Sequence, residues 1–496
     1  MDATRLAAKF RSYPPRLITA IVQVAADQSL ECFVIGGTVR DWLLDRTPGD
    51  LDLTVPVNAV ACCRSLIAQL GSGTFVPLGC SDEDAGRVVW QGLTIDFSSF
   101  RLGAQTIEAD LCLRDYTVNA MGVSLLSLVD AAHAAPQVID PLAGLHDLQQ
   151  QLLRACPDAF SADPLRMLRG YRLSATLGFH LEEATTREIS QHAELIRRVS
   201  VERISHELDL IMASDRAHAV MAEMATSGLL WQVIPELACG RGMAQPVSHH
   251  LDVFEHSLAA LGCMEEIMAA PERFYPECAA SLQEYMAQPG MKVRLKWAAL
   301  LHDLGKPVTM AVRDDQDGRI TFYGHDQTGK KLALKLGRGL KWSNAMREGV
   351  AALIGMHMQP FHLCNVRRHK PLSRKACLNL CRKAGDDLLG LFLLAMADSL
   401  AGKGEEKPPA METELSGLLM EILTIYEEHI RPALTGPRLL TGQDLIAAFA
   451  LQPGPLFAKI LHDLEVAQIE GKVLSRQDAQ RWVQQYLQTN EVNNEI

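Results

Sequence analysis

The sequence predicts an α+β protein in which a strand-containing head is followed by helical domains. Up to about residue 150, short apolar runs alternate with helical stretches, and the runs read CFVIG, DLTV, RVVW, LTIDFSSF and VNAMGVSLL. Such alternation is typical of a sheet covered by helices. From about residue 151 onward, Leu, Ala and Met dominate, β-branched runs are few, and Pro or Gly marks the breaks. This second part is therefore expected to be helical almost throughout.

Changes of composition divide the chain into four predicted domains. At 496 residues the chain is long enough for about three or four of them. The residue composition changes near Cys239–Gly242. The segment Gly402–Pro409 is charged and Pro-rich, as linkers are. The predicted domains are a head at 1–150, a helical neck at 151–240, a further domain at 241–402 and a helical C-terminal region at 411–496.

The composition indicates a soluble globular protein. Hydrophobic residues make up 48% and charged residues 22% of the chain, which are ordinary shares for that class. No stretch approaches about 20 uninterrupted apolar residues, so no membrane span is expected, and no apolar signal segment is apparent. The 12 cysteines lack paired C-x-x-C spacing, so we expect reduced thiols and a cytoplasmic location.

The net charge of −11 argues at first against a nucleic-acid partner. Between Gly329 and Lys383, however, 13 Lys or Arg residues stand against one acid, Glu348. This basic segment could bind a phosphate backbone or a phosphorylated ligand. It could equally be a solvated helical surface balanced by acidic neighbours, and the sequence leaves both interpretations open.

One stretch of the head combines a Gly-Gly turn with paired acids. An apolar run ends at Gly36-Gly37, and Asp50 and Asp52 open the next run after a Pro-Gly turn. Because side chains alternate along a strand, the two acids face the same way. Two such carboxylates suit a pair of Mg²⁺ ions, and the Gly-Gly turn at a helix N-terminus offers N–H groups to phosphates. The alternative is an ordinary βαβ turn with surface aspartates.

Asp-x-Asp placed after Gly-Gly-x-Val-Arg-Asp resembles the head of class II tRNA nucleotidyltransferases and bacterial poly(A) polymerases. The resemblance implies a polymerase-β-like nucleotidyltransferase head with a small mixed sheet, followed by all-α neck, HD and tail domains. It also implies that Asp50 and Asp52 are the catalytic Mg²⁺ ligands. Gly36, Gly37 and Arg40 would then contact the nucleotide.

Two later motifs extend the resemblance. Arg114-Asp115 opens a segment similar to the family's R-R-D-F-T-x-N-A motif, with Leu113 in place of the first Arg. The resemblance implies that Arg114 contacts the incoming nucleotide and that Asp115 buttresses the site. Residues 140–148 match the D-P-x-G-G-x-x-D-L segment that links head and neck, with Ala143 in place of a Gly. Asp96 is a candidate third acid that faces the Asp50/Asp52 pair or only orients other groups.

Polar residues recur every three positions in the first predicted helix of the neck. Pro164 suits the first turn, with Asp163 as N-cap, and the recurring residues are Asp163, Arg166, Arg169 and Arg172. The residues alone favour i,i+3 ion pairs on a solvated face. The resemblance implies instead that Asp163 and Arg166 read the Watson–Crick edge of the incoming base, while Arg169 and Arg172 bind phosphate or sugar. Glu202–Leu208 resembles the segment that closes the neck.

A second metal-binding pattern surrounds His302-Asp303-Leu304-Gly305-Lys306. Adjacent His and Asp can ligate one metal ion or bridge two. With His256 upstream and Asp398 downstream, the order resembles the HD phosphohydrolase superfamily. The resemblance implies a divalent transition metal such as Ni, Mn or Co on His256, His302, Asp303 and Asp398, with Lys306 near a phosphate. His325 and His357 could complete a binuclear site.

Together these patterns predict a template-independent nucleotidyltransferase. A primer 3′-hydroxyl would attack the α-phosphate of CTP or ATP, with tRNA as the preferred acceptor and CCA as the product. A poly(A) polymerase, an A-only enzyme and a CC-only enzyme remain alternatives within the same chemistry. Some relatives carry an HD domain with phosphatase and 2′,3′-cyclic phosphodiesterase activity, so a second alternative is a phosphohydrolase whose head binds RNA. The sequence predicts no oligomeric state.

Overall fold

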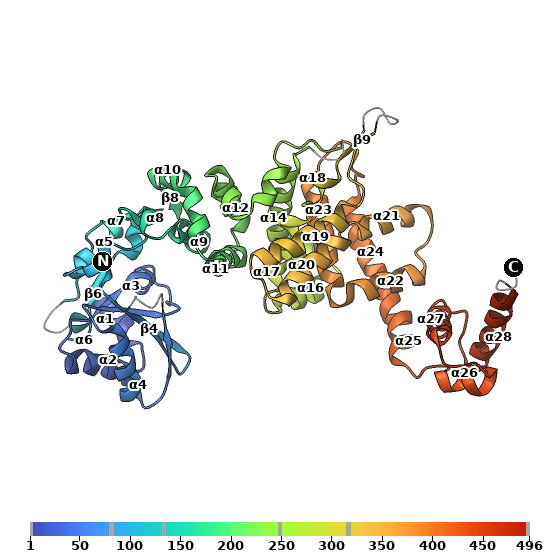
Figure 1. Cartoon of the computed structure of the whole chain (residues 1–496), viewed down its shortest axis with the longest axis horizontal. Coiled ribbons are helices and arrows are strands. Elements are labelled where there is room, and N and C mark those ends of the chain that lie inside the picture. The colour runs from blue at the N-terminus through green and yellow to red at the C-terminus, as the bar shows by residue number, and fades with distance from the viewer. Residues whose placement is uncertain (1–2, 79–83, 131–134, 247–249, 314–318, 493–496) are drawn as a thin grey trace. The chain divides into compact units, whose positions relative to one another are not determined.

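The computed structural model describes residues 3–78, 84–130, 135–246, 250–313 and 319–492 (Figure 1). These residues form two compact units. Unit 1 comprises Met1–Arg216 and Val220–Val233, and unit 2 comprises Ala217–Ala219 and Ile234–Ile496. The two units are described separately below.

Unit 1 contains a six-stranded mixed sheet, as the sequence analysis expected. The strand order is β3-β4-β5-β2-β1-β6. Only β2 and β5 pair in parallel, and all other neighbours are antiparallel. The strands are β1 (Phe33–Ile35), β2 (Leu51–Val55), β3 (Thr74–Pro77), β4 (Ala85–Trp90), β5 (Leu93–Ser99) and β6 (Gly122–Ser124). The sequence analysis predicted each of these strands except β3.

The register of β2 and β5 places acidic residues side by side. Leu51 and Leu53 are buried, each 1% exposed, so Asp52 between them faces the opposite side of the sheet. Asp52 pairs in register with Asp96 of β5. The alternation predicted from the sequence is therefore confirmed, and it brings two acids from distant segments onto one face.

Six helices complete the head: α1 (Ala3–Arg11), α2 (Pro15–Asp27), α3 (Gly36–Leu43), α4 (Ala59–Leu70), α5 (Ile107–Cys112) and α6 (Leu125–Val129). Helix α3 follows β1 without any loop between them. Gly36 has a φ of +65°, which L side chains rarely adopt, so glycine makes this abrupt strand-to-helix turn possible. The turn places the N-terminus of α3 against the acidic face of β2.

The neck is helical apart from one short parallel strand pair, β7 (Leu152–Leu153) with β8 (His180–Leu181), which the sequence analysis did not predict. Helix α9 begins one residue later than expected, with Pro164 as its N-cap, although Asp163 Oδ1 still accepts from the Leu165 N–H at 3.1 Å. The neck helices are α7 (Gly144–Gln149), α8 (Ala159–Ala162), α9 (Leu165–Leu177), α10 (Glu183–His192), α11 (Val201–Ala213), α12 (Ala217–Thr226) and α13 (Leu229–Val233).

Unit 2 is built around one mainly apolar helix, which also carries the candidate metal ligand Asp398. Helix α23 is buried along nearly its whole length, and α14, α17 and α24 pack against it. A short hairpin, β9 (Ala311–Arg313) with β10 (Arg319–Thr321), was not predicted. The helices are α14 (Val253–Ala269), α15 (Pro271–Phe274), α16 (Ala279–Ala287), α17 (Met291–Leu301), α18 (Lys306–Thr309), α19 (His325–Gly339), α20 (Asn344–Met356), α21 (Gln359–His369), α22 (Arg374–Ala384), α23 (Leu388–Ala401) and α24 (Met411–Ile425).

The C-terminal helices surround a small core of their own, which includes Leu445, Ile460 and Val483. They are α25 (Arg431–Thr435), α26 (Gly442–Phe449), α27 (Pro455–Ile469) and α28 (Arg476–Val492). Among the described helices, none is long and apolar enough to cross a membrane. Each described cysteine is a free thiol, as expected.

A buried ion pair joins α17 to α14, the two helices that carry His302 and His256. Lys296 Nζ lies 2.9 Å from Glu265 Oε1 and Lys296 is 2% exposed. The same carboxylate accepts from the Ala217 N–H at 2.8 Å. Removing one partner of a buried ion pair is destabilising, because the attraction that offsets the desolvation of the other charge is lost.

We therefore expect Glu265→Ala to lower the unfolding free energy of unit 2 by about 3–5 kcal/mol. Hydrogen exchange of the α14 and α17 amides would measure the loss. Glu272→Ala removes an exposed carboxylate nearby. It should change the unfolding free energy obtained from hydrogen exchange by less than about 0.5 kcal/mol. Equal protection in the two variants would contradict a stabilising role for the pair.

Candidate active sites

Three carboxylates of the head converge at one point. One oxygen each of Asp50, Asp52 and Asp96 lies within 4.8 Å of the others. Asp50 directly precedes β2, Asp52 lies in β2, and Asp96 lies in the neighbouring β5. The structure thus brings together the predicted pair and the candidate third acid. A set made only of carboxylate oxygens fits a hard divalent cation such as Mg²⁺.

Burial and the neighbouring negative charges raise the pKa of Asp52, the acid in β2. Burial, followed by the negative charge of Asp50, raises the pKa of Asp52 to about 7, although Arg114 and Arg40 act in the opposite direction. Burial and the charge of Asp96 also raise the pKa of Asp50. A bound divalent cation would remove this repulsion and keep both carboxylates ionised. The charge arrangement therefore fits a metal site.

An arginine that the sequence analysis missed holds the third acid. Arg87 of β4 donates two hydrogen bonds to Asp96, each 2.8 Å long, and lies 3.5 Å from Asp50. Arg87 and Asp96 are register partners on adjacent antiparallel strands. This supports the interpretation that Asp96 orients other groups. Only the pairing of β4 with β5, which the sequence does not specify, could have revealed the contact.

The Gly-Gly turn lies directly against the acids. A Cβ at Gly37 would lie 3.4 Å from Asp52 Oδ2, and one at Gly36 would lie 3.5 Å from the same oxygen. The two predicted arginines also approach this turn: Arg40 Nη2 lies 3.6 Å from the Gly37 position and Arg114 Nη1 lies 3.4 Å from the Gly36 position. Backbone N–H groups and two guanidinium groups thus surround the carboxylates, as phosphate binding requires.

Both arginines are buried and held in place. Arg40 donates to Asn119 Oδ1 at 2.6 Å, and Arg114 donates to Asp110 Oδ2 at 3.0 Å. Burial lowers the pKa of Arg114 to about 10, so its charge is retained at neutral pH. Asp110 and Asn119 are partners that the sequence analysis did not identify.

The polar residues of α9 contact distant segments of unit 1. Arg166 donates to the backbone carbonyls of Leu113 at 2.9 Å and Arg114 at 3.0 Å. The other contacts are Arg169 Nε to Asp115 at 2.9 Å, Arg203 Nη2 to Asp163 at 2.7 Å and Arg172 Nε to Glu207 at 2.7 Å. The i,i+3 ion pairs that the residues alone favoured are wrong, because each partner lies outside the helix. The nucleotide contacts assigned to these four residues stay predictions.

In unit 2, six ligand-type side chains form two adjoining triads. His256, His302 and Asp398 make the first, and Asp303, His325 and His357 make the second, with ligand atoms within 4.8 Å of one another in each. These two triads are called the HD cluster below. They contain all four predicted ligands and also His325 and His357, which the sequence analysis gave as possible ligands of a second ion. The residues come from or directly follow α14, α17, α19, α20 and α23.

Asp303 lies between the triads. Its Oδ2 is 3.2 Å from His302 Nε2 and its Oδ1 is 3.5 Å from His325 Nε2. Asp398 Oδ1 is 3.0 Å from His256 Nε2 on the other side of the first triad. One carboxylate with an oxygen toward each triad is suited to bridge two metal ions.

Backbone hydrogen bonds fix the orientation of three histidine rings. Nδ1 of His302, His325 and His357 each lies 2.7–2.9 Å from the carbonyl oxygen three residues earlier. A carbonyl only accepts, so each Nδ1 carries a proton, and Nε2 presents a lone pair to the cluster when the ring is neutral. Burial acts to lower the pKa of His302, but Asp303 and Asp398 outweigh it and raise the pKa to about 10, so binding of a cation at His302 would release a proton from its Nε2. His325 Nε2 and His357 Nε2 lie 3.1 Å apart, and burial lowers the pKa of His357 to about 4. Two facing lone pairs fit a shared cation.

Gly305 explains how α19 reaches this cluster. A Cβ at Gly305 would lie 2.0 Å from the carbonyl oxygen of His325, so only glycine permits the start of α19 to pack on the H-D-L-G-K turn. The next residue, Lys306, is 5% exposed, and its Nζ lies 2.6 Å from Asp303 Oδ2 and 2.6 Å from Gln245 Oε1. The predicted phosphate-binding cation thus lies beside the metal ligands.

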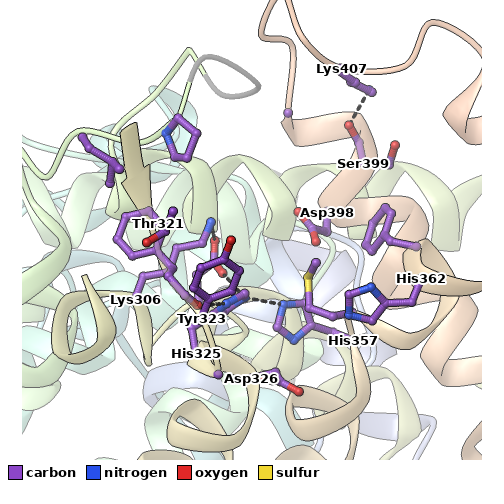
Figure 2. A pocket seen from close by; sticks show the side chains of 18 of the residues that line it. Lys306, Thr321, Tyr323, His325, Asp326, His357, His362, Asp398, Ser399 and Lys407 are labelled. Atoms are coloured by element: carbon purple, nitrogen blue, oxygen red, sulfur yellow. Dashed lines mark hydrogen bonds and ion pairs between the residues drawn. The ribbon is translucent and has the colours of Figure 1, made fainter. Parts of the chain in front are cut away.

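A cavity of about 510 Å³ opens onto the HD cluster (Figure 2). Its polar end includes Asp303, Lys306, His325, His357 and Asp398, and its apolar wall is formed by Phe322, Tyr323, Met358, Phe361 and Met411. Lys407 also lines it and donates to the Ser399 carbonyl oxygen. Gly402–Pro409, which the sequence predicted as a linker, therefore contributes to the wall of this cavity.

Three family descriptions match the chain. Residues 32–154 match the poly(A) polymerase head domain, residues 178–240 match a probable RNA- and SrmB-binding site of polymerase A, and residues 253–402 match the HD domain. Both domain types require divalent metals, in agreement with the two ligand clusters.

Curated relatives align over most of the chain. The A-adding tRNA nucleotidyltransferase of Deinococcus radiodurans is 32% identical over 461 residues, which cover 91% of this chain and 95% of the relative. The CC-adding tRNA nucleotidyltransferase of Thermus thermophilus is also 32% identical, over 91% of this chain and 93% of the relative. A multifunctional CCA protein of Pseudomonas fluorescens is 29% identical over 70% of this chain and 77% of the relative.

Solved structures share the fold. A CCA-adding enzyme in complex with ATP superposes with a TM-score of 0.64 at 18% identity, covering 98% of this chain and 97% of that one. The Thermotoga maritima CCA-adding enzyme in complex with tRNA gives a TM-score of 0.63 at 18% identity, over 98% of this chain and 99% of that one.

The Asp115–Arg169 contact makes a prediction about pH. Burial alone would raise the pKa of Asp115, but the charge and hydrogen bonds of Arg169 hold it well below its usual range. A carboxylate with a depressed pKa in the folded state contributes stability above its unfolded pKa of about 4 and loses it as the pH falls.

Asp115→Asn should therefore lower the unfolding free energy of unit 1 by about 2 kcal/mol at pH 7, less than for a fully buried pair because Arg169 is partly exposed. The deficit should shrink as the pH falls below about 4. Hydrogen exchange of the α9 amides at both pH values checks this, with the exposed Asp158→Asn as control. A deficit that is the same at pH 7 and pH 3 would count against the pair.

Proposed function

Because this chain belongs to the tRNA nucleotidyltransferase family, we propose that it adds C, A or both from CTP and ATP to the 3′ end of tRNA without a nucleic-acid template. Family membership makes the chain an RNA nucleotidyltransferase. The observation that carries the proposal is the convergence of Asp50, Asp52 and Asp96 beside the Gly36-Gly37 turn.

The transferase chemistry follows from these groups. The 3′-hydroxyl oxygen of the RNA forms a bond to the α-phosphorus, and the bond to pyrophosphate breaks. Mg²⁺ held by Asp50 and Asp52 would activate the hydroxyl and neutralise charge on the triphosphate. The Gly37 N–H and the guanidinium groups of Arg40 and Arg114 would hold the triphosphate. The Gly36 N–H donates to the Met121 carbonyl at 3.0 Å, so Gly36 contributes through the turn that it permits. Arg87 keeps Asp96 aligned with the other acids.

The base is read, we propose, by Asp163 and Arg166. Each already has partners: Arg166 donates to two carbonyls, and Asp163 accepts from Arg203 and the Leu165 N–H. Arg166 retains its Nε–H and one further N–H on each Nη, and Asp163 retains free lone pairs. These groups can present donors and acceptors to the edge of C or A. Arg169 and Arg172, bound to Asp115 and Glu207, position this helix and present their remaining N–H groups to phosphate or sugar.

The relatives do not separate A addition from CC addition, since an A-adding and a CC-adding enzyme are equally identical to this chain. Incubating tRNA that lacks CCA, and tRNA that ends in CC, with labelled CTP or ATP decides between them. Long homopolymeric A on generic RNA would instead support a poly(A) polymerase and refute the tRNA assignment.

We expect Asp50→Ala and Asp52→Ala each to slow nucleotide addition about a thousandfold. Loss of a metal ligand removes roughly 4 kcal/mol of charge stabilisation in the transition state. Single-turnover addition to tRNA measures the effect. Asp45→Ala, which removes a carboxylate beyond the C-terminus of α3, should leave the rate within about twofold. Full activity in either active-site variant would refute the proposed metal site.

For unit 2 we propose a two-ion phosphohydrolase that acts on cyclic or terminal phosphate esters. His256, His302, Asp303 and Asp398 would hold one transition-metal ion, with His325 and His357 completing a second site through Asp303. Such ions, with Ni, Mn or Co as candidates, would lower the pKa of a bound water. A water oxygen bonds to phosphorus, the ester bond breaks, and Lys306 stabilises the phosphate charge. Free thiols throughout the described residues fit a reducing, cytoplasmic setting.

Metal content tests this second site. Purified protein loaded with Ni²⁺ or Co²⁺ should hold two ions per chain, and His357→Ala about one, by elemental mass spectrometry. His362→Ala removes a histidine that lines the same cavity outside both triads, so it should keep both ions. One ion in the wild-type protein would refute the binuclear arrangement.

Activity separates the two centres. His302→Ala should abolish hydrolysis of 2′,3′-cyclic and 2′-phosphates while sparing nucleotide addition, and Asp50→Ala should do the reverse. No metal-dependent hydrolysis by Asp50→Ala protein would count against the phosphohydrolase. If the wild-type protein hydrolysed these phosphates but added no nucleotide, the alternative of a phosphohydrolase with an RNA-binding head would gain support.

A further inference from the structure

Helix α19 carries a row of exposed cations, Lys331, Lys335 and Arg338, called the α19 row below. The spacing of i, i+4 and i+7 puts the three on one side of the helix, and all three are exposed. Across the described part of the chain, no carboxylate lies within ion-pair distance of any of them, whereas the nearby Arg347 pairs with Glu348. The row is therefore a line of positive charge that the protein itself does not neutralise.

The rest of the basic segment behaves differently. Arg367 pairs with Glu421, Arg368 with Glu414, and Arg382 with Glu465, while Arg374 donates to the Ile469 carbonyl at 3.1 Å. The two arginines of α21 thus bind α24, and the two arginines of α22 bind α27 of the C-terminal helices. The two interpretations that the sequence left open thus apply to different residues of the segment: these four arginines are engaged within the protein, whereas the three cations of the α19 row are available to an external anion.

The α19 row begins beside the HD cluster. Helix α19 starts with His325, a ligand of the second triad, and both His325 and Asp326 line the cavity. With a rise of about 1.5 Å per residue, the three cations lie roughly 9, 15 and 20 Å along the helix axis from His325. Charge therefore repeats along a line that leads away from the place where the phosphate chemistry is proposed.

We propose that the α19 row holds the phosphodiester backbone of an RNA chain whose 3′ end enters the HD cavity. The proposal rests on the phosphohydrolase function above and names its substrate class as a polynucleotide end. A strand of nucleic acid carries one negative charge per nucleotide. Each phosphate that contacts a Lys or Arg side chain releases a counterion. A mononucleotide that fills the cavity leaves the row unused, so a row of this length fits a polymer.

The first test compares two substrates in the full-length protein. One is a 12-nucleotide RNA that ends in a 2′,3′-cyclic phosphate, and the other is a 2′,3′-cyclic mononucleotide. The variant reverses the charge of the row: Lys331→Glu, Lys335→Glu and Arg338→Glu. We expect its KM for the RNA to rise about tenfold or more, with unchanged kcat and unchanged mononucleotide hydrolysis. The log–log salt slope of kcat/KM on RNA should shrink by about 2, since three single-strand phosphate contacts are lost.

The matched control makes the same change of net charge at three exposed lysines outside α19. Its substitutions are Lys370→Glu directly after α21, Lys375→Glu in α22 and Lys459→Glu in α27. It should keep the wild-type KM for the RNA within about twofold. An unchanged RNA KM in the α19 variant would overturn the proposal, and so would an equal rise in the control. Slower hydrolysis of both substrates would also overturn the proposal, because it would show that the substitutions damage the cavity and not RNA binding by the α19 row.

A second, local measurement does not depend on hydrolysis. Acetylation of lysines in the His302→Ala protein is read by mass spectrometry with and without the same RNA. We expect the RNA to protect Lys331 and Lys335 and to leave Lys459 unprotected. If the wild-type protein hydrolyses neither substrate but RNA protects Lys331 and Lys335, the phosphohydrolase function is refuted and RNA binding by the α19 row is supported. If the mononucleotide is hydrolysed but no protection is seen, RNA binding by the α19 row is refuted and the phosphohydrolase function is supported.

Discussion

The structure of both units depends on holding several metal-ligating side chains at close range. In the head, three carboxylates approach to within 4.8 Å, and in unit 2 two imidazole lone pairs face each other at 3.1 Å. In the head, the like charges of Asp50, Asp52 and Asp96 raise the energy of the empty site. In unit 2, the two nitrogens at this distance need a proton or a cation between them. The surrounding fold must hold these groups at close range until cations neutralise them.

The two units meet that constraint with different devices. The head relies on a sheet: the parallel pairing of β2 with β5 fixes Asp52 beside Asp96, and the buried leucines on the opposite face prevent a slip in register. Unit 2 relies on helix ends and on backbone carbonyls that hold three of the four imidazole rings, while Gly305 lets α19 approach closely enough to supply His325. In each case the apolar core supplies the rigidity, and the polar groups supply the chemistry.

The limits of sequence reasoning follow from which contacts are local. Alternation within one strand was enough to place Asp50 and Asp52, and the H-D motif was enough to find its ligands. The ion-pair partners Arg87, Asp110 and Glu207 were missed for different reasons. Asp110 lies only four residues before Arg114, so this local spacing could have been recognised in the sequence. Glu207 pairs with Arg172 across 35 residues, and the Arg87–Asp96 pair depends on the register of β4 with β5. Because such contacts depend on tertiary structure, the partners of the α9 arginines were misjudged, and the cavity-lining segment Gly402–Pro409 was taken for a linker. The short strands β3, β7 and β9 carry too few residues for any periodicity to appear.

The hydrogen bonds from Arg166 to the carbonyls of Leu113 and Arg114 have a consequence for fidelity. The side chain proposed to inspect the base also holds the main chain of the residue proposed to grip the triphosphate. A poorly matched base that displaced Arg166 would therefore loosen Arg114 as well, so that a wrong nucleotide would be both bound more weakly and aligned less well for attack. Selection of the base and alignment of the triphosphate would therefore depend on the position of one side chain. Displacement of Arg166 by a wrong base would lower both the affinity for the nucleotide and the rate of its addition.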